Sequence, residues 1–63
     1  MSIFTLVYFD RFGKIAAMEE FDASGDGAAR RLAEGRDWSG SYEIRSGSRT
    51  VYAHVGPRQI AGR

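Results

Sequence analysis

The sequence predicts an α+β domain in which a four-stranded antiparallel sheet, formed by two hairpins in ββαββ order, carries one short helix on one face. Two pairs of segments rich in β-branched and aromatic residues are each joined by a glycine-containing turn. One alanine-rich segment with helical spacing lies between the pairs. We expect residues 1–55 to form this single domain and residues 56–63 to form a flexible C-terminal tail.

The first hairpin begins with a strand over Ile3–Phe9, which is apolar on both of its faces and is therefore expected at the centre of the sheet. Asp10–Gly13 has the pattern of a type I turn that ends in a left-handed residue, here Gly13. The return strand covers Lys14–Phe21. Its inner face is apolar except at Glu19.

The helix is expected over Ala28–Glu34, with Ser24 or Asp26 capping its first turn. Gly35 stands where a left-handed residue commonly ends a helix. Leu32 is the one large apolar residue in this segment, and we expect it to face the sheet beside the alanines. A helix this short is not stable alone, so packing on the sheet must hold it.

The second hairpin is expected from a strand over Ser41–Arg45, a turn at Ser46–Ser48 and a strand over Arg49–Val55. Both strands alternate apolar and polar residues, which is typical of strands with one buried face. His54 is out of phase with the apolar residues of its strand, and we expect it on the surface.

The turn at Asp10–Ile15, the strand end at Glu19–Phe21, the short Ala/Arg helix, Tyr42–Ile44 and Arg49–Val51 together resemble a group of small uncharacterised alphaproteobacterial proteins with a ββαββ pattern. The resemblance spans about residues 3–55. It implies the fold and a bacterial origin, and it implies no activity or site.

Composition excludes several classes of protein. The 63 residues contain no cysteine and one histidine, so disulfides and a zinc site built from cysteine or histidine are excluded. Nine basic residues against eight acidic ones give no broad attraction to nucleic acid or anionic lipid. The longest apolar run, Ile3–Phe9, is far shorter than the about 20 residues of a membrane-spanning helix. We expect a cytoplasmic protein.

The candidate chemical motifs are incomplete. Asp22–Gly27 matches the first half of a calcium-binding loop, but Arg30 and Ala33 occupy positions where the second half needs oxygen ligands. Glu19 and Glu20 are neighbours in a strand, so their carboxylates point to opposite faces and cannot act on one substrate. We therefore expect no enzymatic activity, no metal and no cofactor.

Self-association is the function that the sequence favours. One short helix cannot cover both faces of a sheet whose first strand is apolar on both sides, and an exposed apolar face marks an interaction site. We expect a homo-oligomer, most simply a dimer, formed through the helix-free face or through a sheet edge. The residues proposed for the self-association face are Phe4, Leu6, Tyr8, Met18 and Tyr52. The alternative is that Trp38 and the tail, through Ile60, cover this face.

A second function is a sheet that binds single-stranded nucleic acid by stacking bases on aromatic side chains. Phe4, Tyr8 and Tyr52 are the aromatic candidates, and Arg45 and Arg49 are the cationic ones. We favour this alternative less, because the signature of an RNA-recognition sheet is absent and the net charge is close to zero. A partner protein cannot be named from the sequence.

Overall fold

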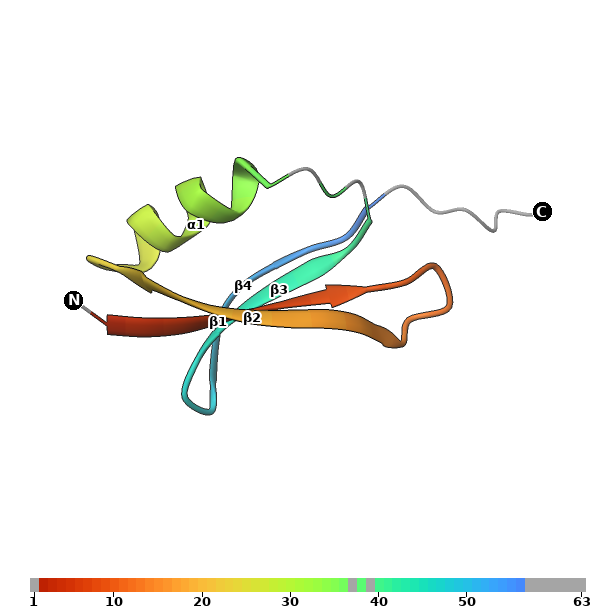
Figure 1. Cartoon of the computed structure of the whole chain (residues 1–63), viewed down its shortest axis with the longest axis horizontal. Coiled ribbons are helices and arrows are strands. Elements are labelled where there is room, and N and C mark those ends of the chain that lie inside the picture. Colours follow the sequence, from red (N-terminus) through yellow and green to blue (C-terminus); the bar gives the residue numbers. More distant parts are fainter. Residues whose placement is uncertain (1, 37, 39, 57–63) are drawn as a thin grey trace.

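The computed structural model describes residues 2–36, 38 and 40–56. It confirms the predicted α+β fold, with one short helix packed against one four-stranded antiparallel sheet (Figure 1). The elements are β1 (Ser2–Phe9), β2 (Ile15–Ala23), α1 (Asp26–Glu34), β3 (Tyr42–Ser46) and β4 (Arg49–His54). Of the predicted tail, residues 57–63 lie outside the described residues.

The strand order in the sheet is β2-β1-β3-β4, and every neighbouring pair is antiparallel. The predicted central position of the first strand is confirmed, because β1 lies between β2 and β3. The two hairpins therefore meet along the β1–β3 pair. Leu6 and Ile44 lie opposite each other in this pair, and Val7 lies opposite Glu43.

Both hairpin turns depend on a glycine with positive φ. Gly13 has φ of 81°, and its amide donates to the Asp10 carbonyl at 3.0 Å, as the type I turn pattern predicts. The Asp10 carboxylate also accepts bonds from the amides of Phe12 (2.8 Å) and Lys14 (3.0 Å). In the second turn Gly47 has φ of 63°. Any other residue at these two positions would be strained.

The helix boundaries differ from the predictions. Gly25 is the N-cap residue, and neither Ser24 nor Asp26 makes a side-chain capping bond. Asp26 is instead the first helical residue, and its carboxylate faces Arg49 of β4 at 3.2 Å. The predicted left-handed stop is also wrong, since Gly35 has φ of −82°. Its amide bonds the Leu32 carbonyl at 3.2 Å, so the helix ends by tightening its last turn.

The core forms between α1 and one face of the sheet. Phe4, Leu6 and Ile44 are each 2% exposed or less, and the helix contributes Ala29 and Ala33, at 0% and 3%. Two alanines on the inner side of a helix allow it to approach the sheet closely. The expectation that Leu32 faces the sheet is not met, because its side chain is 45% exposed.

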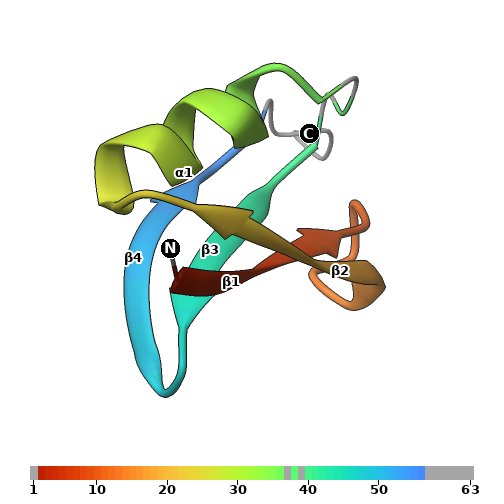
Figure 2. The same ribbon diagram turned by 60° about the vertical axis from the view of Figure 1, so that its left-hand side comes forward.

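The sheet thus has two different faces. The covered face lies beneath α1, as Figures 1 and 2 show, and it carries Phe4, Leu6 and Tyr8 of β1. No described helix or strand lies across the opposite side, which we call the open face. Strand alternation and the register place the following residues of β1, β2 and β3 on the open face: Ile3, Thr5, Val7, Phe9, Ile15, Met18, Glu20, Asp22, Glu43 and Arg45.

Candidate functional site

An apolar strip runs along β1 and β2 on the open face, and it consists of Ile3, Val7, Phe9, Ile15 and Met18. Ile3, Ile15 and Met18 are 56%, 59% and 59% exposed. Val7 is 2% exposed, since Met18 and Glu43 flank it on the two neighbouring strands. Val7, Phe9, Ile15 and Met18 are neighbours in the register, whereas Thr5 separates Ile3 from Val7. The strip thus has a buried centre at Val7 and exposed margins.

Charged side chains lie on both sides of the apolar strip. Glu20 and Asp22 lie on β2, at the outer edge of the sheet, whereas Arg45 and Glu43 lie on β3. Arg45 approaches Glu43 at 3.9 Å, at the outer limit of an ion pair. The Glu43 carboxylate also accepts a bond from the Thr50 hydroxyl at 3.3 Å. The acidic edge on β2 and the cation on β3 make the open face electrically asymmetric.

The five residues predicted to form the self-association face do not share one face of the sheet. Phe4 and Leu6 belong to the core under α1, and Tyr8 and Tyr52 pack against that core. Met18 lies on the open face, opposite Val7. The open-face residues of β1 are thus Ile3, Thr5, Val7 and Phe9, as the strand alternation requires.

The structure also places Trp38, which was the alternative cover for the helix-free face. Its ring packs edge-on against Tyr8 at 5.1 Å, on the covered face. The indole Nε1 donates to the Ser41 carbonyl at 3.0 Å. Ile60 lies outside the described residues. Trp38 therefore extends the cover that α1 provides and leaves the open face as it is.

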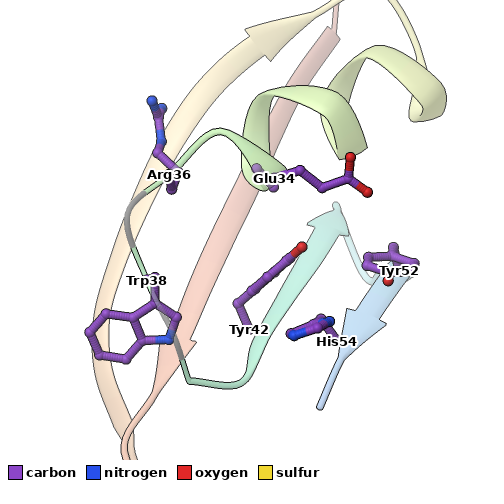
Figure 3. A pocket seen from close by; sticks show the side chains of 7 residues that line it. Glu34, Arg36, Trp38, Tyr42, Tyr52 and His54 are labelled. Carbon is purple, nitrogen blue, oxygen red and sulfur yellow. The ribbon is translucent and has the colours of Figure 1, made fainter. Parts of the chain in front are cut away.

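A second surface feature is an aromatic groove between the C-terminal end of α1 and the β3–β4 hairpin (Figure 3). Its volume is about 340 Å³. The side chains that line it are Ala33, Glu34, Arg36, Trp38, Tyr42, Tyr52 and His54. In Figure 3 the Glu34 carboxylate reaches over the groove, whereas the Arg36 side chain points away from it.

The rings of the aromatic groove pack on one another. Tyr42 stacks on His54 at 5.0 Å and tilts against Tyr52 at 6.2 Å. His54 lies at the surface of the groove, as expected, and this stacking leaves it half-buried. Arg30 of α1 lies over the other part of this cluster, with its guanidinium 4.1 Å from the Tyr52 ring centre. Burial, followed by the nearby Tyr52 and Glu34, raises the pKa of Tyr42.

Glu19, the polar residue on the inner face of β2, has a structural explanation. Its Oε2 accepts a bond from the Tyr8 hydroxyl at 3.1 Å and one from Arg36 Nε at 2.9 Å. Arg36 follows α1, so this carboxylate ties the end of the helix to β1 and β2. Burial and the bond to Glu19 raise the pKa of Tyr8.

The residues considered for nucleic-acid binding are also separated. Phe4 is 2% exposed and stacks on Phe21 at 5.9 Å, so no base can reach its ring. Arg45 lies on the open face, whereas Arg49 lies near α1, where Asp26 holds it. Tyr52, in the aromatic groove, lies against Arg30 of α1, which is not one of the predicted cationic residues.

The described residues include no group of three histidine, cysteine or acidic side chains placed to hold a metal ion. Within the same residues, no helix is long and apolar enough to cross a membrane. No family model, curated protein or solved structure matches this chain. The open face and the aromatic groove are therefore assessed by their geometry alone.

Proposed function

We propose that this protein is a small non-enzymatic interaction module that forms a homodimer through its open face. The observation that carries the proposal is the apolar strip, in which Ile3, Ile15 and Met18 are more than half exposed on a side that no described helix covers. A second copy offers an equal apolar surface, and its contact stabilises a small domain that has no disulfide. The absence of cysteine is compatible with a reducing compartment, and we propose the bacterial cytoplasm.

The open face supports association better than the longer sheet edge does. The outer edge of the sheet is β2, which carries Glu19, Glu20 and Asp22 and no basic residue. Pairing of two β2 strands edge to edge would place these acids close together, and like charges at such positions are unfavourable. The acidic residues thus protect this edge, whereas the apolar strip has no comparable protection.

The test is the oligomeric state in solution, measured by sedimentation velocity at micromolar concentration. The wild-type chain should be a dimer. Met18→Glu should be a folded monomer, because it adds a charge at the exposed margin of the apolar strip. A strictly monomeric wild-type chain would contradict the proposal.

Leu32→Glu is the matched control for Met18→Glu. Leu32 is also partly exposed, at 45%, but it lies on α1 and therefore on the other side of the sheet. This variant should remain a dimer. Circular dichroism must show that both variants keep their secondary structure, so that loss of the dimer is separated from loss of the fold.

The aromatic groove favours one other function, the binding of a single-stranded nucleic acid by base stacking. The observation in its favour is the gathering of Trp38, Tyr42, Tyr52 and His54 around one groove, with Arg30 over the Tyr52 ring. Labelled oligonucleotides of each base, titrated at low salt and followed by anisotropy, test it. Binding that Tyr52→Ala weakens supports this second function, and absence of binding at low salt removes it.

A further inference from the structure

Three residues of the open face form a row that carries opposite charges at its two ends. Thr5 of β1 lies opposite Glu20 on β2 and also opposite Arg45 on β3. Glu20, Thr5 and Arg45 therefore lie side by side across the sheet, with the acid and the cation about 10 Å apart on either side of β1. Among the described residues Glu20 makes no ion pair, and Arg45 has only the 3.9 Å approach to Glu43.

A symmetric dimer can place two open faces together in two basic ways. If the twofold axis runs parallel to β1, the β2 side of one copy lies over the β3 side of the other. If the axis lies in the interface but perpendicular to β1, β2 lies over β2. The perpendicular arrangement brings together two strands that carry Glu20 and Asp22 and no cation. The parallel arrangement instead places each acidic side over a side that carries Arg45.

We propose that two copies pack open face to open face about a twofold axis parallel to β1, with Glu20 of each copy paired to the partner's Arg45. This inference rests on the proposed dimer and adds its orientation. Because Glu20 and Arg45 share the row of Thr5, the axis brings them to the same level along the strands. Facing sheets pack about 10 Å apart and rotate by about 30°, and these two long side chains span the displacement that results.

The two charged residues then act as specificity determinants, while the apolar strip supplies most of the buried surface. Val7 lies near the axis in the centre of the interface, and Met18 lies within the contact. Symmetry makes the Glu20–Arg45 contact occur twice. An interface with this pattern selects a second copy in one orientation and rejects the orientation that aligns the acidic strands.

The experiment uses charge reversal in the full chain. Glu20→Arg places two cations at each contact, and Arg45→Glu places two acids there, so each variant alone should dimerise at least about tenfold more weakly than the wild type. An equimolar mixture of the two variants should recover a heterodimer of near wild-type affinity, because both contacts then pair unlike charges. Recovery in the mixture also shows that residues 20 and 45 pair between chains. Within one chain each variant has two like charges at these positions and cannot form the pair.

Arg31→Glu and Glu34→Arg are the matched controls, because they make the same charge changes on α1. Neither should change the dissociation constant. Unaltered dimerisation of the Glu20→Arg variant, or a mixture that stays monomeric, overturns the orientation. The oligomeric states of the wild type and Met18→Glu are measured in parallel, so a wild-type dimer that Met18→Glu dissociates keeps the proposed function even when the orientation fails. A wild-type monomer overturns both.

Discussion

The two faces of β1 differ in exposure. Leu6, on the covered face, is 1% exposed, whereas Ile3, on the open face, is 56% exposed. Both residues are aliphatic and both belong to the central strand. The difference arises from what lies above them, because α1 packs over one face and no described element packs over the other. Position along the strand matters as well, because Val7, in the middle of the open face, is 2% exposed between its neighbours on β2 and β3. The helix buries its own face of the sheet, whereas on the open face burial is confined to the centre.

The largest expected effect contrasts these two positions. Leu6→Ala should destabilise the domain by about 2–5 kcal/mol, because it leaves a cavity in the core. A domain of this size rarely has more than about 3–5 kcal/mol in total, so the variant should be largely unfolded. Ile3→Ala, made in the Met18→Glu background to hold the chain monomeric, should cost less than about 1 kcal/mol. Urea unfolding followed by circular dichroism measures both, and equal losses would show that the two faces are buried alike.

A smaller effect is expected where Trp38 extends the covered face. A Cβ at Gly40 would lie 3.1 Å from the Trp38 Nε1 and 3.3 Å from the Phe9 carbonyl. Gly40→Ala should therefore displace the indole, shift its fluorescence to longer wavelength and cost about 1 kcal/mol. Gly25→Ala is the control, because a Cβ there meets nothing within 4 Å. An unshifted spectrum in Gly40→Ala would mean that the indole does not pack here.

The pH dependence of stability sharpens the same comparison, since both tyrosines with a raised pKa, Tyr8 and Tyr42, lie on the covered face. The folded state holds these protons more tightly than the unfolded chain does. Their contribution is complete below the ordinary pKa of 10.0, and it is lost as pH rises from there through the raised pKa. Tyr8→Phe should make the alkaline loss of unfolding free energy shallower. A loss as steep as in the wild type would exclude Tyr8 as its source.

The smallest effect is expected at the exposed contact between Arg49 and the first residue of α1. The Arg49 and Asp26 side chains lie 3.2 Å apart but are 60% and 53% exposed, so solvent and salt screen them. Arg49→Ala should lower the melting temperature slightly at low salt. At high salt the two curves should coincide, and a difference that persists there would indicate a packing role for the side chain.

The fold could be predicted because its signals are local. The turn at Asp10–Gly13 needs a left-handed glycine, and the alternation at Ser41–Arg45 requires one buried face. The helix ends were less predictable, since capping by Asp26 competes with its contact to Arg49, which is distant in sequence. The position of Leu32 was also predicted wrongly, because Ala29 and Ala33 already fill the narrow space between helix and sheet.

The candidate site was harder to predict than the fold. Alternation along β1 divides Phe4, Leu6 and Tyr8 from Ile3, Val7 and Phe9, but it does not show which set lies under the helix. A register shift adds a second difficulty. The bulge between Tyr8 and Phe9 places Ile15 opposite Phe9 and thus on the open face, although simple alternation assigns it to the face of Ala17. The charged row was not foreseen, because it depends on which strands are neighbours.

The central position of β1 has a consequence for the order of folding. β1–β2 and β3–β4 are hairpins that close over short loops, whereas β1 and β3 pair only after the chain has passed through the helix. The entropy of closing this long loop makes the joining of the two halves the slow event. Ile44→Val, at the junction, should mainly slow refolding. For Gly47→Ala, at a hairpin tip, the slowing of refolding measures how far that turn has formed in the transition state. Stopped-flow measurements that find no slowing in Ile44→Val would place the joining of the hairpins after the barrier.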